Sequence, residues 1–92
     1  MTLIELGEQV AGRLEAFATA ARLRGMEPAS FHVGVRQHHA LVAWVKHETG
    51  HTRVNVFLLG GIPVWRDERL HHIEIETVYG ANTSHLERCM NL

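Results

Sequence analysis

The stretch SFHVGVRQHHALVAWVKHETGHTRVNVFLL, residues 30–59, decides the fold that the sequence predicts. Phe31, Val33 and Val35 alternate with His32, Gly34 and Arg36, and Leu41, Ala43 and Val45 alternate with Val42, Trp44 and Lys46; we interpret both runs as β-strands with a period of two. Thr49 and Gly50 fit a hairpin turn, and a three-residue loop at 37–39 keeps the apolar side chains of neighbouring strands on one face. The hairpin register then pairs Val45 with Val54, Ala43 with Val56 and Leu41 with Leu58.

An amphipathic helix is expected before this stretch. Thr2-Leu3-Ile4-Glu5 has the spacing of a capping box, in which the Thr2 hydroxyl accepts a hydrogen bond from the Glu5 amide. Gly25, with Pro28 just beyond it, ends the helix. The apolar stripe of this helix recurs at intervals of three and four residues and consists of Leu6, Val10, Leu14, Phe17 and Ala21.

The remaining third of the chain contains shorter elements. Gly60-Gly61-Ile62-Pro63 interrupts the sheet, and a brief strand over residues 64–66 leads to a turn at Asp67-Glu68. Residues 72–79 alternate apolar and polar side chains and predict a final strand. Ser84-His85-Leu86-Glu87 has a second capping-box spacing, which predicts a short C-terminal helix.

Together these elements predict an α+β fold in a single domain spanning residues 1–92. A long N-terminal helix packs on one face of a four- to five-stranded antiparallel meander sheet, and a short C-terminal helix can follow it. The expected core face of the sheet carries Phe31, Val33, Val35, Leu41, Ala43, Val45, Val54, Val56 and Leu58.

Composition narrows the class of protein. The 92 residues contain nine basic and ten acidic side chains, giving a net charge of -1, which argues against holding nucleic acid or anionic lipid by bulk charge. The single cysteine, Cys89, excludes an internal disulfide framework. No apolar run approaches the roughly 18 residues of a membrane span, and no charged leader precedes an apolar run, so we expect a cytoplasmic protein.

The second face of the predicted sheet is the candidate binding surface. Instead of being polar, it combines apolar and aromatic side chains with basic ones, a composition typical of protein interfaces. One interpretation leaves this face without a partner, because the C-terminal helix covers it and Glu74 and Glu76 neutralise its cations. The other interpretation is a docking surface, for which the partner-binding residues are Trp44, Phe57, Arg36, Lys46, Arg53 and His32.

Eight histidines are the unusual feature of the composition. His72, Glu74 and Glu76 share a strand face at two-residue spacing, but a metal site needs a further ligand from another element. No motif for nucleophilic catalysis, phosphate binding or closed metal coordination is present. We therefore expect neither an enzyme nor a cofactor, and the histidines to lie mostly in turns and at strand ends.

These observations favour a non-enzymatic binding, inhibitory or regulatory protein that docks onto a protein or ribonucleoprotein partner. Small, nearly neutral, motif-free α+β proteins of this kind are common among phage and mobile-element factors, such as anti-CRISPR-like inhibitors; this is an analogy of class. Three alternatives stay open: a single-stranded nucleic-acid-binding module that uses an aromatic and basic sheet face, a histidine-rich metal-binding protein, and a homodimer that buries the face against itself.

Overall fold

The computed structural model describes residues 1–54, 58–70, 73–79 and 83–88. The long N-terminal helix is confirmed as α1, Leu3–Leu23. Thr2 caps it as the capping box predicts, because its Oγ1 accepts a hydrogen bond of 3.1 Å from the Glu5 amide. The predicted apolar stripe faces the core: four of its members are buried and Phe17 packs against them from the edge.

The predicted hairpin over residues 41–58 is wrong. Residues Val35–Thr49 form a second helix, α2, which begins after Gly34 and ends at Gly50. Its inward side chains recur at helical spacing as Gln37, Ala40, Leu41 and Trp44, a stripe that the alternation at 41–46 conceals. Gly50 is the helix C-cap, with a φ of 72° and an amide that donates to the Lys46 carbonyl, so the supposed hairpin turn is a helix end.

Within the described ranges, five strands follow the order β2-β3-β1-β4-β5 in the sheet. They are β1 (Glu27–Val33), β2 (Leu58–Leu59), β3 (Ile62–Arg66), β4 (Glu74–Tyr79) and β5 (Thr83–Arg88). The three central strands, β3, β1 and β4, form a mixed sheet: β1 runs parallel to β3 and antiparallel to β4. The expected antiparallel meander of four to five strands is therefore not confirmed.

The parallel pair follows from α2. Parallel neighbours cannot be joined by a tight turn, and a helix is the usual connection between them. Here α2 lies between β1 and β3 in the chain, so these two strands pair in parallel with Phe31 opposite Val64. The brief strand expected at 64–66 is confirmed as the end of β3, and the final strand is confirmed as β4.

The C-terminal helix predicted from Ser84 is also wrong. Residues Thr83–Arg88 form β5, which pairs antiparallel with β4 along its whole length. A helix of fewer than ten residues is marginal in water, whereas a six-residue ladder satisfies the backbone groups of both strands. The stabilisation that a capping box at Ser84 could provide is smaller than the stabilisation from the pairing of β5 with β4.

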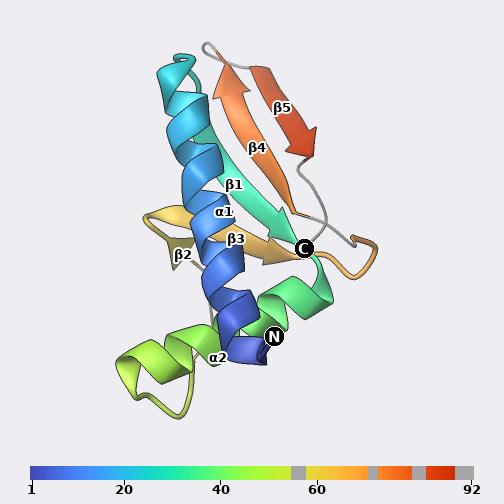
Figure 1. Cartoon of the computed structure of the whole chain (residues 1–92). Helices are drawn as coiled ribbons and strands as arrows, with labels where there is room; N and C mark the ends of the chain where they lie inside the picture. The colour runs from blue at the N-terminus through green and yellow to red at the C-terminus, as the bar shows by residue number, and fades with distance from the viewer. Residues whose placement is uncertain (55–57, 71–72, 80–82, 89–92) are drawn as a thin grey trace.

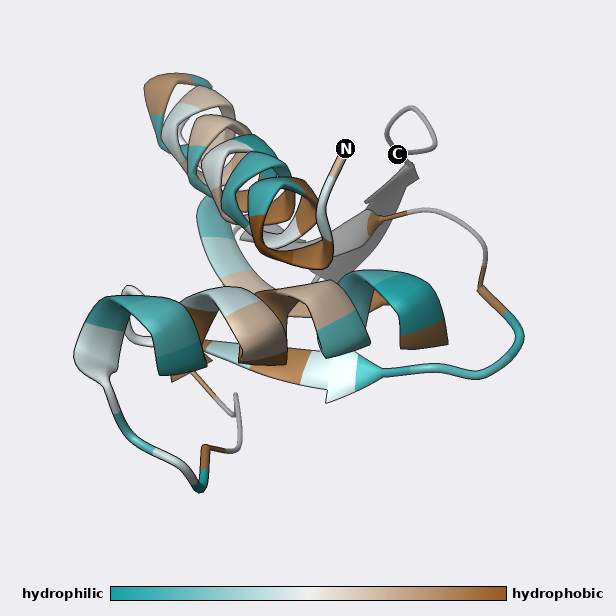
Figure 2. Cartoon of the chain, turned by 60° about the horizontal axis from the view of Figure 1, so that its bottom comes forward, coloured by the Kyte–Doolittle hydropathy of each residue, from teal (hydrophilic) through white to brown (hydrophobic). Residues whose placement is uncertain are grey.

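The two helices share one core with the sheet. α1 crosses the sheet in front of β1 and β3, and α2 lies beneath the N-terminal half of α1 (Figure 1). The core joins Val10 and Leu14 of α1, Leu41 of α2, and Phe31 and Val64 of the sheet. Figure 2 shows α1 and α2 crossing each other, and α1 also packs directly against β1. Within the described residues, no helix is long and apolar enough to cross a membrane.

Candidate functional site

The face of the sheet that points away from α1 is the candidate binding surface. Phe31, Val33, Ile62 and Val64 are buried on the helix side, so the residues that alternate with them point to the other side. The strand registers place Leu58 opposite Pro63 and His32 opposite Trp65. We call this surface the open sheet face, and it consists of Ser30, His32, Leu58, Pro63 and Trp65 with the adjoining loop, residues 66–69.

Two large apolar side chains are exposed on this face. Trp65 keeps 58% of its surface accessible and Leu58 keeps 61%. Both belong to the β2–β3 pair, where Leu58 is the partner of Pro63, two residues before Trp65 on the same side of the strand. In a small domain, a tryptophan with this exposed fraction leaves a large apolar area in contact with water.

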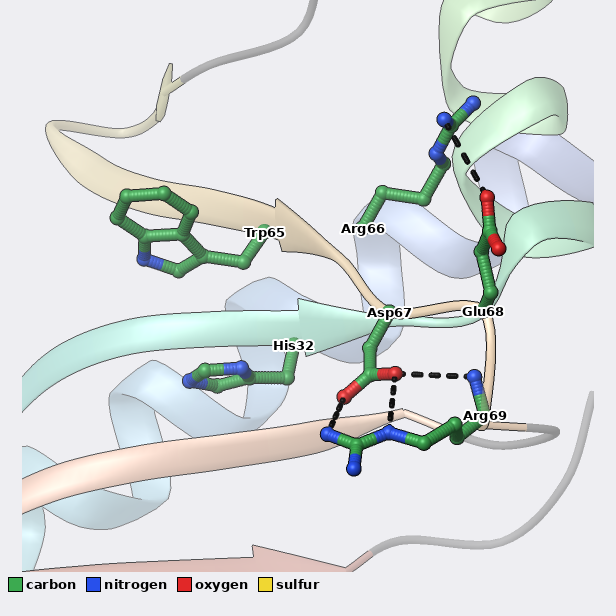
Figure 3. Close-up of a pocket in the computed structure, with 6 residues that line it drawn as sticks. All are labelled: His32, Trp65, Arg66, Asp67, Glu68 and Arg69. Carbon is green, nitrogen blue, oxygen red and sulfur yellow. Dashed lines mark hydrogen bonds and ion pairs between the residues drawn. The ribbon is translucent and has the colours of Figure 1, made fainter.

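His32 lies next to Trp65 and is held in place from its own strand. Its Nε2 and the Oγ of buried Ser30 share a hydrogen bond of 2.9 Å. Figure 3 shows the imidazole and indole rings on neighbouring strands, with Asp67 and Arg69 beyond His32. The two rings and residues 66–69 line an open depression of about 500 Å³.

The loop after β3 carries two ion pairs at the edge of this depression. Arg66 lies 3.9 Å from Glu68, and the Arg69 guanidinium lies 3.3 Å from Asp67. The Asp67 amide donates to the Val33 carbonyl, which ties the loop to the end of β1. Each arginine of the loop thus has a carboxylate beside it, and the edge of the depression is close to neutral overall.

Asp67 is the carboxylate of this loop that accepts hydrogen bonds from both the backbone and the side chain of Arg69. Hydrogen bonds from the Arg69 amide (2.9 Å) and then from its guanidinium lower the pKa of the Asp67 carboxyl below its ordinary value of 3.8. Because the folded chain favours the ionised form, this contribution to stability is present above the ordinary pKa. It is lost as the pH falls through the lowered value.

The structure separates the residues that the sequence analysis grouped on one sheet face. Of the six predicted partner-binding residues, His32 lies on the open sheet face. Trp44, Arg36 and Lys46 lie on α2, where Trp44 is half-buried against the core and the two cations are exposed. Arg53 is exposed in the segment after α2, and Phe57 lies outside the described residues.

The common surface is lost because residues 41–46 are helical, so alternate residues no longer share a side. Partner binding by these six residues stays a prediction.

Trp65 and Leu58 were missed as site residues. The sequence did contain a signal: Pro63 and Trp65 alternate with Ile62 and Val64, and a strand apolar on both sides indicates either burial on both sides or an exposed apolar face. What packs on each side of the sheet decides between these two cases. That packing depends on elements distant in the sequence, such as α1 and the parallel neighbour β1.

The histidines do not gather into a metal site in the part of the chain that the structure describes. There, no group of three or more His, Cys, Asp or Glu side chains is placed to hold a metal ion. The strand-face set of the sequence analysis, His72 with Glu74 and Glu76, has its side chains outside that part. Metal binding by that set stays an untested alternative, which metal analysis of chelator-free protein addresses.

Comparison with models of known protein families, with curated proteins and with solved structures finds no match to this chain. The geometry of the open sheet face and the charges around it therefore provide the basis for a functional proposal.

Proposed function

We propose that this chain is a non-enzymatic binding protein that docks its open sheet face onto an apolar patch of a protein, with Trp65 as the anchor. The observation that carries the proposal is the exposed Trp65 side chain, flanked by Leu58 and His32 on the side of the sheet that points away from α1. Tryptophan is the residue type most enriched among the side chains that dominate binding energy.

The charges around Trp65 support a protein partner at this face. A strand of nucleic acid needs unpaired cations for its phosphates, but Arg66 and Arg69 already have Glu68 and Asp67 beside them. Paired charges around an apolar centre are instead typical of the polar rim of a protein interface. The partner surface expected here is apolar at its centre, with both signs of charge around it.

The proposal extends to an inhibitory or regulatory role in the cytoplasm, on a free protein or the protein part of a ribonucleoprotein. A phage or mobile-element origin, as for anti-CRISPR-like inhibitors, is the setting that fits a small domain with a binding face and no catalytic motif. The support for this setting is an analogy of class and the chemistry of the face.

The test compares three baits: the unchanged chain, Trp65→Ala and Leu23→Ala. Leu23 is the matched control because it is 84% exposed but lies at the end of α1, outside the open sheet face. A protein captured by the unchanged chain is purified and titrated by calorimetry against all three. We expect Trp65→Ala to weaken the affinity at least about 30-fold and Leu23→Ala to leave it within about twofold.

Three outcomes contradict the proposal. The first is equal affinity of the Trp65→Ala and unchanged chains for every purified partner. The second is a homodimer in light scattering that Trp65→Ala dissociates, because the face then serves a second copy. The third is a single-stranded oligonucleotide whose binding requires Trp65, which assigns the face to base stacking.

A further inference from the structure

A second surface, on α2, differs in chemistry from the open sheet face. On the outward side of α2, Arg36, His39, Ala43 and Lys46 recur at intervals of three and four residues, and His47 follows directly. The four charged or titratable members are exposed. We call Arg36, His39, Lys46 and His47 the α2 basic stripe. Figure 2 shows the polar residues at both ends of α2, with the apolar segment between them.

The placement of Arg36 works against helix stability. The N-terminus of a helix carries a partial positive charge, so the first turn favours acidic side chains. The first turn of α2 contains none, and Gly34 provides no side-chain hydrogen bond to the free amides there. A cation in this position has no evident structural role, and residues that break a local rule without compensation are candidates for function.

The permanent cations of α2 and of the segment that follows it also have no carboxylate partner among the described residues. Among the residues that the structure describes, Arg36, Lys46 and Arg53 form no ion pair, whereas Arg66 and Arg69 on the open sheet face each have one. Glu48, 3.9 Å from His47, is the acidic side chain nearest to the stripe in the chain. Three permanent positive charges are thus left within one helix and the segment that follows it.

The uncharged residues beside the α2 basic stripe indicate which class of ligand this surface can bind. A protein interface or a membrane surface needs large apolar side chains beside the cations. Here the outward residues beside the charges are Ala43, which is half-buried, and Val35, a single aliphatic side chain that is 44% exposed at the start of the helix. Trp44 points inward, with its Cβ directly beneath Gly7 of α1. Binding at this surface therefore depends on charge and requires a polyanion.

We propose that the α2 basic stripe, together with Arg53, binds the phosphate backbone of a duplex nucleic acid. A duplex fits better than a single strand because the described outward side of α2 presents no aromatic ring on which an unpaired base can stack. The contacts are to phosphates, so binding is weak and independent of sequence. This inference does not depend on the proposed function of the open sheet face.

The experiment measures the binding of fluorescein-labelled duplexes of about 20 base pairs, one of DNA and one of RNA, by anisotropy from about 50 to 200 mM NaCl. Three phosphate contacts predict a slope of log Ka against log salt concentration of about -2.7. The double variant Arg36→Gln/Lys46→Gln leaves one contact, for which we expect a slope of about -0.9 and an affinity at least tenfold weaker at the lowest salt, on the order expected for two lost contacts.

The charge-matched control is Arg13→Gln/Arg22→Gln, which removes two cations from α1 and leaves the stripe intact. We expect it to keep the slope and the affinity within about twofold. Folding of both variants is checked by thermal unfolding, where Arg36→Gln should leave Tm unchanged or raise it. The proposal is overturned if neither duplex binds, if both double variants lose affinity equally, or if a single strand of equal length binds more tightly than the duplex.

Discussion

At the scale of single residues, Gly7 sets how closely α1 approaches α2. A Cβ added at Gly7 would overlap the Ala40 carbonyl oxygen and lie 2.6 Å from the Trp44 Cβ. Because backbone atoms of α2 cannot move aside without shifting the helix, Gly7→Ala should destabilise the protein by about 1–3 kcal/mol. Chemical denaturation followed by circular dichroism measures this change.

Gly12 provides the internal control for this prediction. It lies on the same helix, but an added Cβ meets nothing within 4 Å. Gly12→Ala should therefore stabilise the protein by about 0.5–1 kcal/mol through its better helix propensity. Equal shifts for the two variants would contradict the close contact between α1 and α2.

The two tryptophans have different surroundings although they are the same residue type. The sequence analysis assigned the exposed aromatic position to Trp44, but this side chain is half-buried between α1 and the core. Trp65, which the sequence placed in a brief strand, is the exposed one. Both lie in apolar segments, so their surroundings were decided by the element that contains them and by its neighbours.

At the scale of elements, α2 is the segment that the sequence patterns misread. The apolar residues of 40–45 are nearly continuous, so they satisfy a period of two and a helical period together. The usual start signal is missing, because Gly34 occupies the N-cap without a capping side chain. Its end signal, Gly50, is shared by hairpin turns and helix caps.

Gly50 gives a test of the α2 end. With a φ of 72°, it adopts the left-handed conformation that costs other residues about 1–2 kcal/mol. Gly50→Ala should destabilise the protein by about 1 kcal/mol, and Gly50→Asn by less, because asparagine tolerates this conformation. Thermal and chemical unfolding of both variants measure the difference. Identical stability of all three proteins would contradict a helix that ends in this conformation.

The two capping-box sequences had different outcomes for a physical reason. The box at Thr2 precedes a stripe that continues for about five turns and packs on the core, so the local signal and the burial agree. The box at Ser84 has no such continuation, and residues Thr83–Arg88 pair with β4 instead. A cap is worth about 1 kcal/mol, less than the ladder of hydrogen bonds that a strand of this length forms.

At the scale of the whole molecule, two surfaces of different chemistry lie on different layers. The open sheet face offers apolar area with paired charges, whereas Arg36 and Lys46 of the α2 basic stripe have no carboxylate partner among the described residues and Val35 is the large apolar side chain exposed beside them. The pattern of the sequence predicts one face that joins His32 of the sheet with the cations of α2, whereas Trp65 and Leu58 lie outside that predicted face. The separation of the two surfaces supports two independent binding reactions, each with its own variants and its own dependence on salt.

Charge gives a prediction for the molecule as a whole. The net charge is -1 with neutral histidines, and protonation of all eight raises it to +7. The calculated isoelectric point of about 6.7 lies inside that transition. Because repulsion between copies is weakest near zero net charge, solubility should pass through a minimum between about pH 6 and 7 and rise toward pH 5. Light scattering across this range measures it, and a flat profile between about pH 5.5 and 7.5 would contradict the prediction.

Local sequence patterns were sufficient to predict α1 with its cap and buried stripe, strands that overlap β1, β3 and β4, and the low net charge. These depend on contacts within about four residues or on simple counts. Tertiary structure alone decided that α2 is a helix, that β1 and β3 are parallel and that Trp65 is exposed. In each of these cases local preferences were nearly balanced, and burial against residues distant in the chain made the difference.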